Sequence, residues 1–166
     1  NRNSDHENKE DFGEFLTDAP TYESLLAAVD FACSDNHEIP VLLIDGAEGL
    51  GKKSITNTII NKYKEVYSEK VTTHFWTGKD ITDFYIKMLH GAKIPDFIDA
   101  IIKPDILIIS DINYLEGKYE TTAALLGCLK KRFEKNKFKL VIITGDIKKM
   151  NWEKSANELL KGAFRL

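Results

Sequence analysis

The stretch GAEGLGKKS, residues 46–54, has the glycine and lysine spacing of a phosphate-binding loop. Such loops follow the pattern G-x-x-x-x-G-K-[ST], and Gly46, Gly51 and Lys52 satisfy it. Glycines are needed because backbone N–H groups must turn inward and approach phosphates closely, while the lysine reaches the terminal phosphates. We therefore predict a site for ATP or ADP made by a continuous segment: Gly46, Ala47, Glu48, Gly49, Leu50, Gly51, Lys52, Lys53 and Ser54.

One position of this loop departs from the pattern. Lys53 stands where a Ser or Thr hydroxyl would hold magnesium, and the Ser54 hydroxyl, one residue further along a helix, is turned by about 100°. Asp45 and Glu48 add negative charge beside a site for phosphate, and like charges repel. Two interpretations stay open: surviving nucleotide binding, or a loop retained because the strand-to-helix turn needs it. The sequence supports no magnesium site, and we assign no metal ligand.

Two further strand ends carry polar residues that could complete a nucleotide site. Nucleotide-hydrolysing sites use one acid after a buried strand to hold magnesium and a second to orient water. The run "DILIISD" ends in Ser110 and Asp111, so only the second acid is present, and Asp111 is the one catalytic candidate if the chain is active. "VIITGD" offers Thr144 and Asp146 as sensors of a terminal phosphate, and we include Asp111 and Asp146 in the candidate nucleotide site. Each of these ends is also explained by an ordinary strand exit or helix cap.

The pattern around these motifs alternates short apolar runs with amphipathic segments. The apolar runs "IPVLLIDG", "VTTHFWT", "DILIIS" and "FKLVIITGD" predict strands, most of them buried on both faces. Because buried strands alternate with helices, the chain is predicted to be an α/β protein of the phosphate-binding-loop kind, with a parallel sheet covered on both faces. Helices are predicted over 21–35, 55–66, 80–91 with Asp80 as the cap and Gly91 as the stop, 94–102, 119–135 with Ala123, Leu126, Leu129 and Phe133 on one face, and 152–160.

Length and composition bound the class of protein. At 166 residues one domain is expected, with residues 1–10 as a disordered leader or remnant and 11–166 as the folded unit. A net charge of -3 argues against a surface built mainly to hold nucleic acid. No run is long enough to span a membrane and no signal peptide is visible, so we expect a cytoplasmic protein without membrane contact.

Cysteines, lysines and aromatic residues have plainer explanations than chemistry. Cys33 and Cys128 lie in apolar helical patterns and are expected to be buried thiols in a reducing compartment. The aromatic residues between 75 and 97 are expected to fill a core rather than stack on bases. A basic cluster is either a solvated helix end or a patch for DNA or a partner: Lys130, Lys131, Arg132, Lys135, Lys137 and Lys139.

The motifs together resemble the AAA+ domain of the DnaA family of bacterial replication initiators, including its Hda-type relatives. The resemblance runs from about Asp11 to the C-terminus. "DFGEFLTDAPTYESLLAAV" is similar to the family's entry segment, "VLLIDGAEGLGKKS" to its phosphate loop, "PDILIISDINYLEGK" to its paired-aspartate strand and "KLVIITGD" to its sensor strand. The resemblance implies a P-loop AAA+ core over residues 11–166, without the lid and helix-turn-helix domains of the family.

Three departures from the family pattern fall on separate catalytic elements. Lys53 replaces the magnesium-binding Thr, Ser110 replaces the first aspartate, and Ala163 takes the place of the arginine that acts across a subunit interface, with Arg165 two residues away. The resemblance therefore implies an ATPase that has lost hydrolysis. We hypothesise that the Lys53 ammonium lies near the magnesium locus, where it could pair with Asp111 or with a phosphate and allow metal-independent nucleotide binding.

Three functions compete for this chain. The first is a replication-initiation or regulatory module that acts by docking on an initiator, on another AAA+ protein, on a second copy of itself or on DNA. DNA is weakly supported, because residues 79–105, where the family contacts single strands, carry four lysines and five aspartates. The second is a functional ATP-binding initiator core that binds origin DNA. The third, a small P-loop phosphotransferase, is least favoured because no arginine-bearing lid is visible.

Overall fold

A computed structural model describes residues 22–34, 39–46, 51–135, 139–152 and 154–166. Residues 1–21, which include the leader and the first part of the entry segment, and residues 47–50 of the phosphate loop lie outside the described residues. The leader over residues 1–10 and the domain boundary at residue 11 therefore stay predictions.

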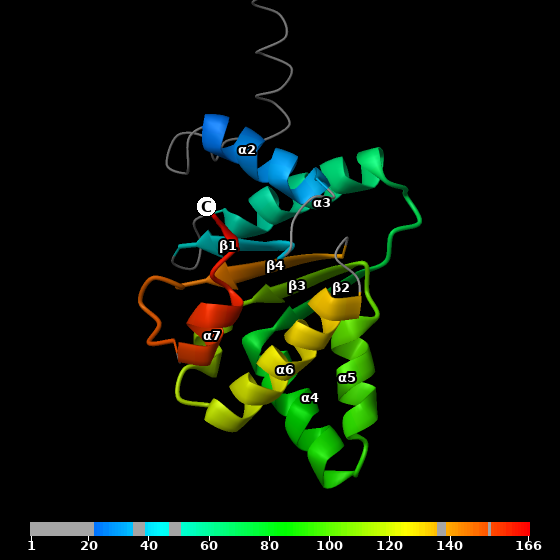
Figure 1. The fold of residues 1–166 in the computed structure, drawn as a ribbon, viewed down its shortest axis with the longest axis vertical. Coiled ribbons are helices and arrows are strands. Elements are labelled where there is room, and N and C mark those ends of the chain that lie inside the picture. The colour runs from blue at the N-terminus through cyan, green and yellow to red at the C-terminus, as the bar shows by residue number, and fades with distance from the viewer. Residues whose placement is uncertain (1–21, 35–38, 47–50, 136–138, 153) are drawn as a thin grey trace, which may run out of the picture.

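The centre of the molecule is a five-stranded parallel sheet in the order β2-β3-β4-β1-β5 (Figure 1). Its three middle strands are runs of Leu, Ile and Val whose side chains are buried on both faces, as the apolar patterns predicted. The two-residue strand β5 was not predicted. The strands are β1 (Val41–Asp45), β2 (Thr73–Thr77), β3 (Ile106–Ser110), β4 (Leu140–Gly145) and β5 (Phe164–Arg165).

Helices cover both faces of this sheet, which confirms the predicted α/β architecture (Figure 1). On one face lie α2 (Tyr22–Cys33) and α3 (Lys52–Val66). The other face carries α4 (Gly78–His90), α5 (Ile94–Ile102), the short 3-10 helix η2 (Ile112–Leu115), α6 (Tyr119–Lys135) and α7 (Lys154–Leu159).

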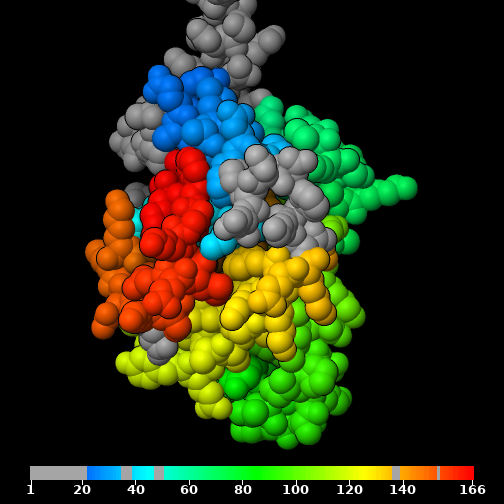
Figure 2. All heavy atoms as spheres, viewed as in Figure 1, coloured from blue at the N-terminus to red at the C-terminus, as the bar shows by residue number. Residues whose placement is uncertain are grey.

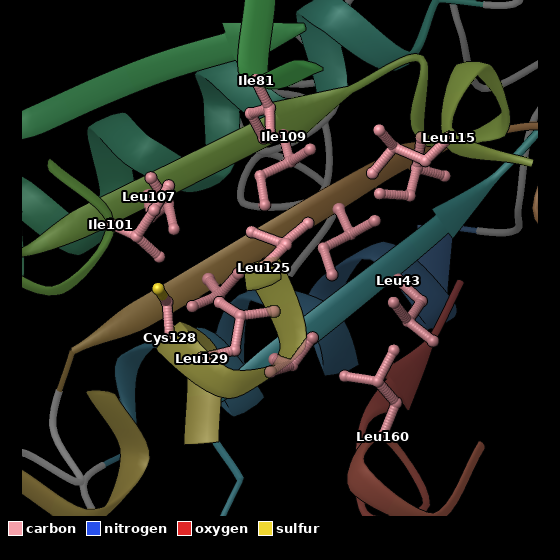
Figure 3. Close-up of a cluster of buried hydrophobic side chains, with 14 of the residues drawn as sticks. Leu43, Ile81, Ile101, Leu107, Ile109, Leu115, Leu125, Cys128, Leu129 and Leu160 are labelled. Atoms are coloured by element: carbon pink, nitrogen blue, oxygen red, sulfur yellow. The ribbon is translucent and has the colours of Figure 1, made fainter. Parts of the chain in front are cut away.

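Each face of the sheet has its own apolar core. The core beneath α4 to α7 contains Ile81, Leu107 and Leu129, which interdigitate between sheet and helices (Figure 3). The core beneath α2 and α3 contains Leu25 and Ile59. In the space-filling view the C-terminal residues lie between α2 and α7 (Figure 2).

Three details of the predicted helices were wrong. Helix α4 begins at Gly78 with Thr77 as its N-cap, while Asp80 occupies the third helical position and returns a bond to the Thr77 N–H at 3.1 Å. In α6, Ala123 is exposed and Leu125 is the residue that packs in the core. The last helix is confined to residues 154–159.

Arg132 does not belong to the surface cluster in which the sequence places it. Its side chain is fully buried, and its guanidinium donates to the carbonyl oxygens of Ile101, Ile102, Asp105 and Leu140 at 3.0–3.2 Å. Burial disfavours the charged form and lowers the pKa of Arg132 to about 10. One arginine thus ties the end of α5 to the starts of β3 and β4.

The two cysteines are free thiols. Cys128 is buried in the core beneath α6, while Cys33 is half-buried at the end of α2. Burial raises the pKa of both thiols, which matches the expectation of packing rather than reactivity.

Candidate nucleotide site

A pocket of about 720 Å³ lies at the carboxyl edge of the sheet, between α3 and strands β2, β3 and β4. Ligands of open parallel sheets bind at this edge, because the loops that follow the strands converge there. The α3 side contributes Gly51, Lys52, Lys53, Ser54, Thr56, Asn57 and Ile60, and the strand side contributes Phe75, Ile108, Ser110, Asp111 and Thr144.

The α3 end of the pocket has the geometry of an anion site. Gly51 has φ 80°, a left-handed conformation that suits glycine, and the helix begins immediately after it at Lys52. The first turn of α3 carries no acidic residue, so the positive end of the helix dipole is not offset by a carboxylate. Lys52 and Lys53 add two cations to this end of the pocket.

The residues that replace the magnesium ligands are brought together here. Lys53 lines the same pocket as Ser110 and Asp111, and its side chain is exposed. Magnesium prefers oxygen ligands in near-ideal octahedral geometry, and a pocket with an ammonium at position 53 and Asp111 as the single carboxylate among its described lining residues does not supply them. The described residues of this pocket therefore do not fit a magnesium ion.

Asp111 has an unusual backbone at the end of β3. Its φ is 49°, one of two positive φ values among the described non-glycine residues, and it occupies the N-cap position of η2. Its carboxylate makes no capping hydrogen bond, although the Tyr114 N–H donates to its backbone oxygen at 2.9 Å. The helix-cap explanation of Asp111 thus accounts for its backbone and not for its carboxylate.

Asp45 is directed away from the role that its charge suggested. Its Oδ1 accepts the Lys148 N–H at 2.8 Å, and its Oδ2 lies 3.9 Å from the Lys148 ammonium. Asp45 is not among the described residues that line the pocket. The repulsion of phosphate that we expected from Asp45 is therefore reduced, while Glu48 lies outside the described residues.

The polar exit of β4 divides between two roles. Thr144 is buried and lines the pocket. Asp146 does not line it in the described part of the chain: its N–H donates to Asn113 Oδ1 at 3.1 Å, and its carboxylate lies 3.5 Å from the Lys149 ammonium. Of the two candidates, only Thr144 faces the site.

The far end of the pocket was not anticipated from the sequence. Ile60, Phe75 and Ile108 make it apolar, and Phe75 is 52% exposed. Thr56 lies among them, and its hydroxyl is buried without a hydrogen-bond partner among the described residues. The Lys52-to-Thr56 spacing of one helical turn is the sequence signal that could have placed Thr56 here.

Backbone contacts join the three strand exits around the pocket. The Gly46 N–H donates to the Gly145 oxygen at 3.0 Å, which links the ends of β1 and β4. A Cβ at Gly145, whose φ is 145°, would fall 2.7 Å from Asn113 Oδ1 and 3.0 Å from the Ile112 nitrogen. Only glycine therefore permits the β3 and β4 exits to approach this closely.

The sheet order, the loop-to-helix anion site and the polar strand exits define an α/β domain of the P-loop NTPase class, of AAA+ type. Comparison with known families then gives the particular group. The model of the bacterial DnaA ATPase domain matches residues 7–164, and the chain belongs to this family.

Individual relatives agree with this assignment. The chain is 28% identical over 126 residues to the chromosomal replication initiator protein DnaA of Treponema denticola, and 30% identical over 120 residues to that of Geobacter sulfurreducens. These matches cover 76% and 72% of the chain, and 26% of each relative. The chain thus spans about a quarter of the length of these curated relatives.

Solved structures share the fold. Domain III of the Thermotoga maritima replication initiation protein DnaA superposes with a TM-score of 0.72 at 19% identity, over 93% of this chain and 63% of that one. The AMPPCP-bound DnaA of Aquifex aeolicus gives a TM-score of 0.67 at 17% identity, over 87% and 45%. The DnaC helicase loader shares the fold less closely, with a TM-score of 0.55 at 16% identity, over 89% of this chain and 85% of that one.

Two remaining expectations concern the C-terminal segment and membranes. Ala163 is partly buried against the core beneath α7, and Arg165 is exposed on β5. Among the residues that the structure describes, no helix has the length and apolar character needed to cross a bilayer.

Proposed function

We propose that this chain is a replication-initiation or regulatory module that binds ATP or ADP without magnesium, does not hydrolyse it, and acts through contacts with another protein. The observation that carries the proposal is the position of Lys53, in one pocket with Ser110 and Asp111. In this proposal the Lys53 ammonium supplies the positive charge that a metal ion supplies in a working ATPase.

Nucleotide binding is supported by the α3 end of the pocket. The N-terminus of a 15-residue helix and two lysines are suited to a polyphosphate, because amide N–H groups and ammonium groups both donate to phosphate oxygens. Two solved DnaA proteins of the same fold are bound to AMPPCP. Lys52 would contact the terminal phosphates, with Lys53 beside them.

Loss of hydrolysis is supported by what the pocket does not offer among its described residues. Phosphoryl transfer depends on positioning and on neutralising charge with metal ions and arginine side chains. The pocket has Ser110 in place of one acid, and Ala163 stands where the family's interfacial arginine is expected. Asp111 alone could still orient a water molecule, but Ser110 supplies no second carboxylate at the end of β3 to hold a metal ion.

Action through protein rather than single-stranded DNA is supported by the charges on α4 and α5. One solved DnaA is described as bound to single-stranded DNA. In this chain, the Lys79 ammonium lies 2.6 Å from Asp83 Oδ2, and the Lys103 ammonium lies 3.2 Å from Asp99 Oδ2. Two of the four lysines of residues 79–105 are therefore already paired with carboxylates. A phosphate backbone would have to compete with these carboxylates.

Calorimetric titration with ATP and ADP, in EDTA and in magnesium, tests the proposal. We expect binding in EDTA, because Lys53 replaces the metal, and a loss of about tenfold or more in affinity for Lys53→Ala, since a charge-assisted hydrogen bond contributes about 1.5–3 kcal/mol. Lys149→Ala is the matched control, because Lys149 pairs with Asp146 outside the pocket lining. The double variant Lys53→Thr, Ser110→Asp should make binding depend on magnesium.

Two outcomes contradict the proposal. Binding of ATP only in magnesium, or ATP hydrolysis that Lys52→Ala abolishes, would favour a working initiator core instead. Absence of binding in both buffers would favour a loop kept for its turn.

A further inference from the structure

Strand β2 forms one edge of the sheet, and its outer side is unpaired in the described part of the chain. In the strand order, β2 neighbours only β3. An edge strand presents a row of N–H and C=O groups that can pair with another strand. The residues that present these groups can be identified from the ladder between β2 and β3.

Thr73 and Phe75 direct their backbone groups outward. The Ile106 N–H donates to the Thr72 oxygen at 2.9 Å, so Thr72 faces β3. In a parallel ladder the residues that face one neighbour alternate along the strand, so His74 also faces β3, whereas Thr73 and Phe75 face away from it. The Thr77 N–H is outward too, but it is bonded to Asp80 Oδ2 at 3.1 Å.

The side chains of β2 do not protect this edge. Natural edge strands are usually shielded by lysine, proline, a bulge or a covering loop, and THFWT contains no lysine or proline. Thr73, His74 and Phe75 are all exposed. Phe75 lies on the α3 face and lines the pocket, while His74 stacks on Trp76 on the opposite face at 4.6 Å between ring centroids.

An antiparallel copy of the same strand complements this edge. With the two-fold axis at His74, Thr73 of each chain lies opposite Phe75 of the other, and the outward groups of these two residues make four hydrogen bonds. The flanking charges allow this approach, because Glu69 and Lys70 precede the strand and Lys79 and Asp80 follow it. Each end is neutral overall, so neither end of one strand repels the adjacent end of the other.

We propose that β2 pairs antiparallel with β2 of a second copy of this chain, across a two-fold axis at His74, so that two five-stranded sheets join into one. The interface is isologous, since the same residues serve on both sides. It does not depend on nucleotide, so it can stand or fall independently of the proposed function. Because the paired segment is short, the dimer should dissociate on dilution.

Sedimentation velocity without nucleotide, over about a hundredfold range of protein concentration, tests the proposal. We expect a reversible monomer–dimer equilibrium that Phe75→Lys and Thr73→Pro each weaken at least about tenfold, because one adds a charge to the edge and the other removes an outward N–H. Ile86→Lys is the matched control, because Ile86 is an apolar residue on α4 with 43% exposure. Circular dichroism and thermal melting verify that each variant is folded.

Cysteine cross-linking tests the register. Directly opposed residues of a non-hydrogen-bonded antiparallel pair have Cα atoms about 4.5 Å apart, within the range for a disulfide. In a background with Cys33→Ser and Cys128→Ser, His74→Cys should give a covalent dimer on mild oxidation, and Lys87→Cys on α4 should not. A chain that is monomeric at every concentration, a dimer that survives both edge variants, or a dimer that His74→Cys fails to link would each overturn the proposal.

Discussion

Single residues in this chain depart from what their types suggest. Arg132 follows two lysines in the sequence, yet it lies in the interior and serves four carbonyl groups. Lys53 keeps the surface exposure of an ordinary lysine, yet it lines one pocket with Ser110 and Asp111. Charge alone predicts the position of neither side chain, because segments distant in the sequence form the surroundings of each.

Removing the Arg132 guanidinium should be among the most destabilising single changes in the chain. Arg132→Met leaves buried carbonyl groups without donors, and we expect a loss of about 3 kcal/mol or more in the free energy of unfolding. Arg132→Lys should recover part of this loss, because an ammonium has fewer donors and lacks the planar fork. Urea denaturation measures both.

Lys131→Met provides the control for Arg132, because Lys131 is exposed on the same helix. Its effect should stay within about 0.5 kcal/mol. Equal losses at the two positions would show that the buried hydrogen bonds contribute nothing specific.

Helical periodicity could have placed Arg132 in the core. Leu125, Leu129 and Arg132 follow the spacing of one helix face, and Leu125 and Leu129 are buried. The charge of Arg132 and its neighbours Lys130 and Lys131 favour a surface position instead. Phe75 is a different case, because its place at the apolar end of the pocket depends on the pairing of β2 with β3 and on the packing of α3 against the sheet.

At the level of elements, local signals predicted the extent of α6 and the end of α4. Gly91 ends α4 as expected, and α6 occupies 119–135 as predicted. The start of α4 was misplaced because Thr77 and Asp80 both cap well in isolation, and their three-residue spacing is the capping-box signature. Strand β5 carries little local signal in two residues, since it exists through pairing with β1.

The capping box of α4 predicts a measurable stability difference. Thr77→Ala removes the acceptor of the Asp80 N–H, which lies 3.0 Å from the Thr77 hydroxyl, and should cost about 1 kcal/mol in urea denaturation. Lys93→Ala is the comparison, because Lys93 occupies the N-cap of α5 without a side-chain capping bond. If both variants lost the same stability, the capping box would not be the cause.

At the level of the whole molecule, alternating strands and helices were enough to predict a two-faced parallel sheet. The order of the strands was not predicted, because many right-handed arrangements of the same elements satisfy the same pattern. The phosphate loop and the exits of β3 and β4 could be assigned to one site because parallel strands share a carboxyl edge. The contacts of the Asp45 carboxylate with Lys148 and of the Asp146 carboxylate with Lys149 depend on loop geometry that the residue types do not encode.

Alkaline pH should destabilise the whole fold through Tyr63. Tyr63 is a residue of α3 and is buried in the core beneath α2 and α3, and this burial raises its pKa from 10.0 to about 12. The unfolded chain therefore releases this proton first, so the stability that neutral Tyr63 contributes is complete below about pH 10 and is lost as pH rises toward about 12. Tyr63→Phe should flatten the fall in unfolding free energy across this window, as measured by urea denaturation at each pH.

Tyr119→Phe is the control for this pH dependence, because Tyr119 is 68% exposed. It shows how much a tyrosine at the surface contributes to the alkaline slope. The same flattening in both variants would mean that the burial of Tyr63 is not responsible.

The buried guanidinium of α6 also limits how this sequence can diverge. Its four acceptors are carbonyl oxygens at the end of α5 and at the starts of β3 and β4. No other side chain at position 132 can donate a hydrogen bond to all four. An evolutionary path away from arginine would need backbone changes in three segments at once. The adjacent Lys130 and Lys131 carry no such constraint and are free to drift, even to the opposite charge, so three consecutive basic residues should evolve at very different rates.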